Sequence, residues 1–290
     1  MTRAILTGAI VVAVTSVIAA QPTFRSAVTG VRIDVSVMNG LTPVAGLTRD
    51  NFTVVDNGVA QTIESVVVED VPLSLTLVLD TSASMRGDRL SHLVDASKAL
   101  IKALHADDEA ALITFSEPVR LSVATTLDRA PLLEAIGRLD ASGMTSLNDA
   151  IFLGLQLRPL AISDKTPVLL VFSDGHDNTS WLRQPQLVDA VKRSSMLLHI
   201  VELLQPEMNL ASRPSDLLRE LARAGGGRHW TALKASDLND LFGKALNELR
   251  ARYLVTYSPA GVSRDGWHDV KVTLKNARGD VTARPGYFAQ

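Results

Sequence analysis

The sequence predicts an α/β protein built on a doubly wound, mainly parallel sheet, with a smaller β-sandwich-like module made from the two ends of the chain. Two observations lead to this prediction. Between about residues 70 and 250, short apolar runs alternate with segments of helical periodicity, which is typical of a parallel sheet covered by helices. On either side of this region, apolar and polar residues alternate with period two, and turn residues separate the runs.

The amino-terminal flank carries the first period-two segments. Residues 31–37 alternate as a half-buried strand should. Residues 51–55 and 61–68 lie on either side of Asp56-Asn57-Gly58, which is a strong hairpin signal. Because isolated hairpins are marginally stable in water, we expect these strands to pair with strands from the carboxyl-terminal flank.

The central region supplies the alternating elements. Strands are expected, in chain order, at residues 73–79, 110–115, 119–123 as an antiparallel edge, 168–172, 195–202 and around 229–230. Helices are expected over residues 90–104, after Asp128, and over residues 147–155, 217–221 and 238–249. Gly154 lies on the apolar face of its helix, where it permits close packing. Gly225-Gly226-Gly227 ends the helix before it and leads into the last short strand.

The carboxyl-terminal flank returns to strands at residues 253–257, 267–274 and 280–284. The resulting division of the chain is a signal peptide at 1–20, an amino-terminal β segment at 21–70, an α/β domain at 71–252 and a carboxyl-terminal β segment at 253–290.

The amino terminus has the pattern of an export signal. A positive start, Met1-Thr2-Arg3, precedes an apolar run over residues 4–20, and the small pair Ala19-Ala20 precedes Gln21. We expect cleavage near Ala20 and a secreted, periplasmic or cell-envelope location. The alternative is an uncleaved anchor, since the run is near the lower limit for spanning a bilayer. Only in that case is the membrane a partner.

Composition excludes several other classes of function. Lys and Arg number 29 against 31 Asp and Glu, a formal net charge of -2, so there is no basic footprint for nucleic acid. The chain has no cysteine, which excludes a disulfide framework and a lipid-attachment cysteine. The six histidines show no paired zinc spacing.

The candidate functional site begins at Asp80-Thr81-Ser82-Ala83-Ser84, which follows the first central strand. In open α/β sheets, ligands bind at the carboxyl ends of the strands. The D-x-S-x-S pattern resembles the metal-ion-dependent adhesion site of the von Willebrand factor type A family, which adds a threonine and a second aspartate from two later loops. The segments Gly143–Ala150, with Thr145, and Phe172–Gly175, with Asp174, match those loops in order.

This resemblance implies a ligand set and a function. Ser82, Ser84 and Thr145 would bind the cation directly, while Asp80 and Asp174 would bind it directly or through water. Oxygen ligands suit Mg²⁺, with Mn²⁺ or Ca²⁺ as alternatives. Neutral hydroxyls leave the cation under-neutralised, so it can accept a carboxylate from a protein partner. We therefore expect a metal-dependent binding or adhesion protein with no catalytic residue.

The flanks extend the resemblance to a bacterial group of proteins related to this family, with biological roles mostly unassigned. The matching features are residues 46–52, the turn at 56–58 and the tail Arg284–Phe288. Together with the central motifs they cover roughly residues 30 to 288.

Other interpretations remain open at this point. Asp80 and Ser84 are also residues that cap helices. The chain is alternatively a scaffold with a vestigial metal site, or a Mg²⁺-dependent phosphohydrolase. The last needs a second acid two residues after the nucleophile, where this chain has Ser82. His176 is interpreted as a solvated loop residue, and Asp177 lies near the site in sequence but outside the family's ligand set.

Overall fold

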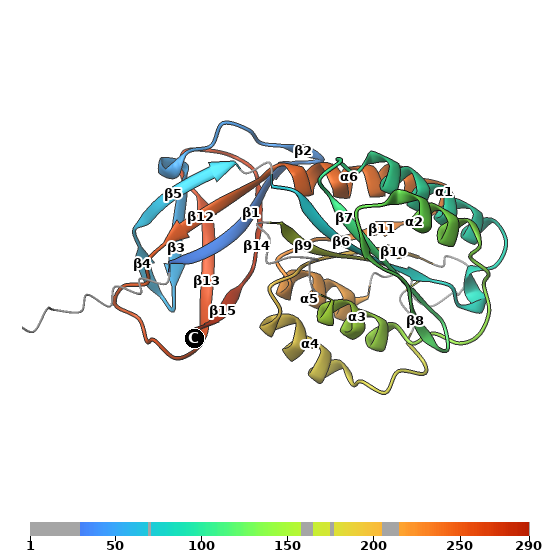
Figure 1. Ribbon diagram of the computed structural model, residues 1–290. Coiled ribbons are helices and arrows are strands. Elements are labelled where there is room, and N and C mark those ends of the chain that lie inside the picture. The colour runs from blue at the N-terminus through green and yellow to red at the C-terminus, as the bar shows by residue number, and fades with distance from the viewer. Residues whose placement is uncertain (1–29, 69–70, 158–164, 175–176, 205–214, 290) are drawn as a thin grey trace, which may run out of the picture.

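The α/β domain is organised around a six-stranded sheet in the computed structural model, which describes residues 30–68, 71–157, 165–174, 177–204 and 215–289 (Figure 1). The strand order is β11-β10-β9-β6-β7-β8. The strands are β6 (Leu73–Asp80), β7 (Glu109–Phe115), β8 (Val119–Thr126), β9 (Thr166–Ser173), β10 (Leu197–Leu203) and β11 (His229–Ala232). All neighbours are parallel except β7 and β8, which confirms the predicted mainly parallel sheet with an antiparallel edge.

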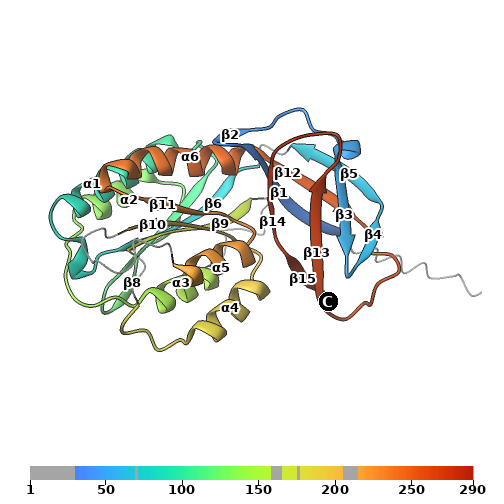
Figure 2. The same cartoon turned by 180° about the vertical axis from the view of Figure 1, so that it is seen from behind.

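Within the described residues, six α-helices cover the two faces of this sheet (Figures 1 and 2). One face packs against α1 (Asp88–Ala103), α2 (Arg129–Gly137) and α6 (Leu238–Arg250). The other face packs against α3 (Leu147–Gln156), α4 (Gln184–Arg193) and α5 (Asp216–Ala224). Short 3-10 helices lie at Arg49–Asn51 (η1), Ala83–Met85 (η2) and Ala235–Asp237 (η3).

The apolar runs of the central strands serve both cores. Along β9, Val168, Leu170 and Phe172 face the core under α1, α2 and α6, while Leu169 and Val171 face the opposite core. Successive side chains of a strand point to opposite faces, so a strand covered on both sides must be apolar throughout. This is why these runs show no alternation in the sequence.

Local signals explain where two of the helices begin and how one packs. Asp128 accepts a hydrogen bond from the Ala130 amide at 2.9 Å and thereby caps α2. Ser215 caps α5 in the same way through the Leu218 amide at 3.3 Å. A β-carbon at Gly154 would lie 2.4 Å from the Leu169 side chain, so this glycine is what lets α3 approach β9.

The second module is a sandwich of two antiparallel sheets (Figure 1). One sheet has the order β14-β1-β12-β5 with β2 added to β1, and the other has the order β15-β13-β3-β4. The strands are β1 (Val31–Asn39), β2 (Thr42–Pro43), β3 (Phe52–Asp56), β4 (Val59–Gln61), β5 (Ile63–Val68), β12 (Arg252–Tyr257), β13 (Gly266–Leu274), β14 (Asp280–Ala283) and β15 (Gly286–Ala289). Strand β1 pairs with β12 and β14, and β3 pairs with β13, so the predicted pairing of the two flanks is confirmed.

Two details of the sandwich differ from the sequence prediction. The expected single strand over residues 61–68 is divided, because β4 pairs with β3 while β5 pairs with β12 in the opposite sheet. Residues 59–68 contain no Gly, Pro, Asn or Asp, so the sequence gives no turn signal at Thr62, where the chain crosses to the other sheet. In addition, residues 286–289 form a strand that pairs with β13 and was not predicted.

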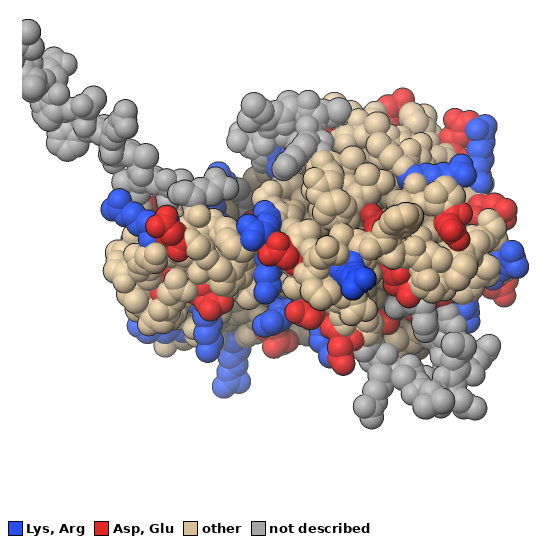
Figure 3. All heavy atoms as spheres, turned by 90° about the horizontal axis from the view of Figure 1, so that it is seen from below, with Lys and Arg blue, Asp and Glu red and all other residues tan. Residues whose placement is uncertain are grey.

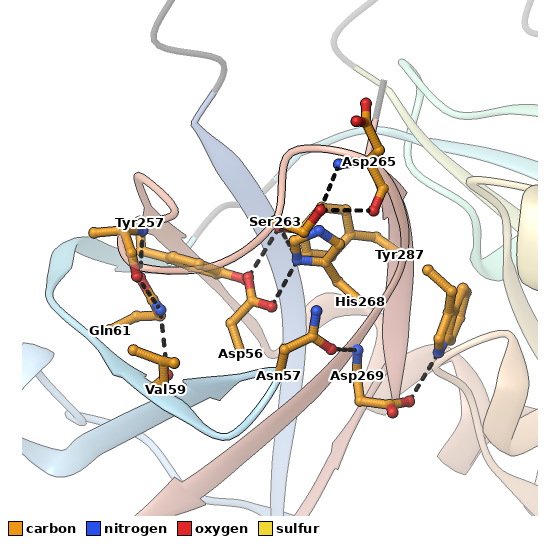
Figure 4. Close-up of polar contacts among 12 residues, drawn as sticks. Asp56, Asn57, Val59, Gln61, Tyr257, Ser263, Asp265, His268, Asp269 and Tyr287 are labelled. Atoms are coloured by element: carbon orange, nitrogen blue, oxygen red, sulfur yellow. Dashed lines mark hydrogen bonds and ion pairs between the residues drawn. The ribbon is translucent and has the colours of Figure 1, made fainter.

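A buried polar cluster joins the two flanks inside the sandwich (Figure 4). The Asp56 carboxylate accepts hydrogen bonds from the hydroxyls of Tyr257 and Tyr287 at 2.8 and 2.9 Å. Its other oxygen lies 2.7 Å from Nδ1 of His268. Burial and the bond to Asp56 raise the pKa of Tyr287 to about 12. One amino-terminal carboxylate thus gathers three side chains from the carboxyl-terminal flank.

The expected signal peptide at 1–20 lies outside the described residues. Among the residues that are described, none of the helices combines the length and apolar character that crossing a bilayer requires.

Candidate functional site

The first loop of the site begins where β6 ends. Both oxygens of the buried Asp80 carboxylate are held, one by the Ser82 amide and the other by the Ser173 hydroxyl, each at 2.9 Å. The hydroxyl oxygens of Ser82 and Ser84 lie 3.0 Å apart. Ser82 is buried and Ser84 is exposed, so this pair of hydroxyls leads from the interior to the surface.

The capping interpretation of this loop is wrong. Helix α1 begins at Asp88, and its N-cap is Gly87, with φ of 74° and no side-chain cap. The short helix η2 follows Ser82, which makes no side-chain cap hydrogen bond either. Asp80 instead bonds within its own turn, and Ser84 bonds to Ser82. The side chains of Asp80 and Ser84 are therefore not used to begin α1.

The second loop, before α3, is bonded to the first through backbone groups. The Ser142 amide donates to the Thr81 carbonyl at 2.9 Å, and the Ala83 amide donates to the Gly143 carbonyl at 3.0 Å. Gly143 has φ of 79°, a conformation that glycine adopts without strain. These two bonds hold the chain on either side of Ser82 against the loop that carries Thr145.

The third loop, after β9, is bonded in turn to the second. The Thr145 amide donates to Oδ1 of Asn178 at 2.8 Å, and its carbonyl accepts from the amides of Asn178 and Thr179 at 3.0 and 3.2 Å. Thr145 is buried. It is thus fixed between the loop that follows β9 and the loop that follows β6.

Asp174 is the last described residue before residues 175–176, and it is buried at the end of β9. Because β6 and β9 are adjacent and parallel, their carboxyl ends lie side by side. The pKa of Asp80 is raised to about 6. Burial is the largest cause, and the negative charge of Asp174 is the next. The two carboxylates are therefore close enough to interact. The structure brings Asp80, Ser82 and Ser84 into direct contact and carries Thr145 and Asp174 on the two adjoining loops.

A bracing network beside the site was missed by the sequence analysis. Asp177 accepts from the Asn148 amide at 2.8 Å and the Ser180 amide at 3.1 Å. Asp149 accepts from the amides of Trp181 and Leu182 at 3.0 and 2.9 Å. Together these bonds fix residues 177–182 to the first turn of α3. The run Asp177-Asn178-Thr179-Ser180 was the available signal, because such side chains hydrogen-bond to nearby backbone.

The site's donors are hydroxyls and carboxylates. Within the described ranges, no group of three or more His, Cys, Asp or Glu side chains is arranged to hold a metal ion. Gly175 and His176 lie outside those ranges, so the interpretation of His176 as a solvated residue stays a prediction. Ser82 occupies the position where a phosphohydrolase of the type considered above would need a carboxylic acid.

Comparisons with known proteins identify the domain that carries this site. Residues 75–176 match the family model of the von Willebrand factor type A domain. An uncharacterized protein, sll0103 of Synechocystis, is 32% identical over 109 residues, which are 37% of this chain and 26% of that protein. The chain matches a still smaller share, 15%, of inter-alpha-trypsin inhibitor heavy chain H2 from Sus scrofa, at 28% identity over 44% of this chain.

Solved structures agree in fold. The structure described as von Willebrand factor type A from Catenulispora acidiphila has a TM-score of 0.52 and 14% identity, over 87% of this chain and 75% of that one. Proximal thread matrix protein 1 from the mussel byssus, described with a zinc-occupied MIDAS motif, has a TM-score of 0.53 and 12% identity, over 67% of this chain and 49% of that one. On the family match, residues 75–176 of this chain form a von Willebrand factor type A domain, and the solved structures show the same fold.

Proposed function

We propose that this protein is an exported, metal-ion-dependent binding protein that recognises an acidic group on a protein partner. The observation that carries the proposal is the joining of three loops by hydrogen bonds at the carboxyl edge of the sheet. The first of these loops carries the hydroxyls of Ser82 and Ser84, which lie 3.0 Å apart.

The chemistry of these residues fits a divalent cation. Ser82, Ser84 and Thr145 would hold the ion directly, and Asp80 and Asp174 would hold it directly or through water. Hydroxyl and carboxylate oxygens are the ligands of hard cations, and Mg²⁺ retains several waters that an incoming group can replace. Mg²⁺ is our proposed ion, with Mn²⁺ or Ca²⁺ as alternatives. The relative from the mussel byssus, described with zinc in its MIDAS motif, supports a cation at the corresponding loops.

Recognition follows from the small negative charge of this ligand set. When bound, the cation supplies a positive centre with a position for one external oxygen ligand. The chain's own residues prepare that position: Ser173 and the Ser82 amide keep Asp80 oriented, and Asn178 keeps Thr145 in place. Three of the five side chains are neutral, so a carboxylate from the partner would complete both the coordination and the charge. No step of this kind needs a nucleophile or a general base, and we propose a binding function without catalysis.

Metal titration of the full chain tests the cation site. Addition of Mg²⁺ or Mn²⁺ should raise the unfolding temperature, since a ligand at about 100 times its dissociation constant adds about 2.7 kcal/mol of stability. Ser84→Ala should abolish the rise, because it removes a proposed metal ligand. Ser84 is exposed and contributes little to the core, so the variant should fold as the wild type does. Ser91→Ala, at an exposed serine of α1, is the matched control and should keep it. The proposal would be contradicted by an equal rise in the unfolding temperature of the wild type and Ser84→Ala, or by no rise in either. The site would then be vestigial.

The acidic partner is tested with arrays of peptides that each present one Asp or Glu. Binding should require the divalent ion and should be lost when Asn or Gln replaces the acid. Retention of binding in chelator, or with the amide peptides, would contradict recognition through the metal.

Export rests on the positive start and apolar run of residues 1–20. We propose a secreted or cell-envelope location. Sequencing the amino terminus of the protein recovered from its natural host distinguishes a chain cleaved near Ala20 from one that keeps an anchor.

A further inference from the structure

A cleft of about 480 Å³ lies between the two modules, away from the candidate metal site. Its walls come from α5 and the start of β11 on one side and from β13 and β14 on the other. Because β11 is parallel to β10, its neighbour in the sheet, the start of β11 belongs to the amino edge. The metal site follows the carboxyl ends of β6 and β9, at the opposite edge.

The charge of the cleft is one-sided. Five cationic side chains line it and no Asp or Glu is among the described lining residues; the cations are Arg219, Arg223, Arg228, Lys271 and Arg284. The whole chain has a net charge of -2, so this is a local concentration of positive charge. Figure 3 shows Lys and Arg side chains along the boundary between the sandwich, at the left, and the α/β domain, with some acidic side chains beside them.

Two of these arginines are fixed in place. Arg228, just before β11, pairs with Glu248 at 3.1 Å and donates to the Thr282 hydroxyl of β14 at 3.0 Å. Arg284 donates to the Met196 carbonyl at 2.6 Å. Burial, together with the nearby positive charge of Arg252, lowers the pKa of Arg284 to about 10, while Asp34 acts in the opposite direction. Arg284 is thus held near a second cation, Arg252.

Two other cations extend into solvent beside them. Arg223 and Lys271 are exposed, one on α5 and one on β13, and neither side chain makes a hydrogen bond or ion pair with another described residue. Arg219, also exposed, pairs with Asp216 at 2.7 Å. The cleft therefore combines a fixed pair of guanidinium groups with two cations that have no partner among the described residues.

We propose that this cleft binds a small oxyanion carrying two or more negative charges, of the phosphate or sulfate class, between the two modules. Guanidinium groups present parallel N–H donors that match the oxygens of such anions, and Lys adds a point charge. The volume lies within the range of small-molecule sites. An anion here would offset the mutual repulsion of cations from both modules. The proposal is independent of the metal site, which lies at the other edge of the sheet.

Titration calorimetry on the full chain in metal-free buffer tests the proposal with inorganic phosphate, pyrophosphate and sulfate. Because the buffer contains no divalent ions, any anion binding that is measured cannot come from the metal site. We expect saturable binding that weakens with added salt and is tightest for pyrophosphate. Arg223→Gln and Lys271→Gln should each weaken binding by about tenfold, since each removes one charge-assisted contact. Arg120→Gln on β8 and Lys102→Gln on α1, both exposed, are matched controls and should bind as the wild type does.

A lipid headgroup and a free phosphate compound share this chemistry. Sedimentation with phosphatidylcholine vesicles, with and without a phosphoinositide, separates the two sources: headgroup binding gives co-sedimentation that Arg223→Gln reduces, and a free ligand gives calorimetric binding alone. Absence of binding in both assays at millimolar anion overturns the proposal. Equal losses in the cleft variants and in the two control variants also overturn it, because the effect would then be one of overall charge.

Discussion

At the scale of single residues, the glycines around the last central strand show how the chain comes close to itself. Gly225-Gly226-Gly227 was predicted to end a helix, and α5 does end at Ala224. Gly226 has φ of 71°, as the turn requires. The reason for Gly227 is different: a β-carbon there would lie 2.1 Å from the carbonyl oxygen of Leu198. That oxygen belongs to the backbone of β10 and cannot move aside as the end of a side chain can.

Gly227→Ala should therefore destabilise the protein by about 1–3 kcal/mol, the usual cost of overpacking. Gly243 is the matched control, because it is an exposed residue of α6 and a β-carbon there meets nothing within 4 Å. Gly243→Ala should stabilise the protein by about 0.5–1 kcal/mol, since alanine loses less conformational freedom in a helix. Urea unfolding measures both changes, and changes of the same sign would contradict this explanation.

At the scale of elements, Asp108 connects four segments at the amino edge of the sheet. Its buried carboxylate accepts hydrogen bonds from the Leu73 amide of β6 at 2.7 Å and from the His105 amide after α1 at 2.6 Å. Arg250, the last residue of α6, forms an ion pair with it. The Asp108 carbonyl also accepts from Arg129, the first residue of α2, at 2.6 Å. One loop residue thus fixes the positions of three helix ends relative to the sheet.

Burial alone would raise the pKa of Asp108, but the hydrogen bonds from Arg250, Leu73 and His105 lower it below the ordinary carboxyl value. The ionised form therefore stabilises the fold at any pH above that ordinary value, near 3.8, and this contribution is lost as pH falls through the lower folded-state pKa. Asp108→Asn should cost about 3–5 kcal/mol at neutral pH, because it leaves Arg250 without its anion. The cost should shrink below about pH 4.

The measurement is urea unfolding of the wild type and Asp108→Asn across a pH series. Asp107→Asn, at the exposed neighbouring position, is the control and should have little effect at any pH. A cost of Asp108→Asn that is constant from neutral to acid pH would refute the assigned role of the charge.

At the scale of the whole molecule, buried arginines connect the sandwich to the α/β domain. Arg252 of β12 donates to the carbonyl oxygens of Asp34 and Gly226, at 3.1 and 3.0 Å, which belong to different modules. Arg284 donates across the boundary to Met196. The Arg193 guanidinium of α4 lies 4.2 Å from the ring centroid of Phe288 in β15. Contacts of this kind join the two modules along several elements.

We therefore expect the described modules to unfold together, with calorimetric and van't Hoff enthalpies that agree. The double variant Arg252→Gln with Arg284→Gln should lower the midpoint temperature of unfolding. Its calorimetric enthalpy should exceed its van't Hoff enthalpy, because the modules then unfold separately. Arg49→Gln with Arg120→Gln, at two exposed positions, is the control and should behave as the wild type does. Two resolved transitions in the wild type would contradict a connected molecule.

Much of this architecture follows from local patterns in the sequence. Apolar runs of the right length predict strands covered on both faces, period two predicts the flanks, and Asp128 predicts the start of α2. The three loops of the site also stand in the order that the family requires. These signals are local, because the side-chain periodicity of a strand or helix and the chemistry of a turn are set within a few residues.

What only the tertiary structure decided depends on residues far apart in the chain. The crossing from β4 to β5, the pairing of β15 with β13 and the gathering of three carboxyl-terminal side chains on Asp56 all join distant segments. So do the bracing of Thr145 by Asn178 and the cationic cleft between α5 and β13. Local periodicity states which side of an element is buried but not which distant element covers it, and that choice is made by packing and hydrogen-bond satisfaction in the folded chain.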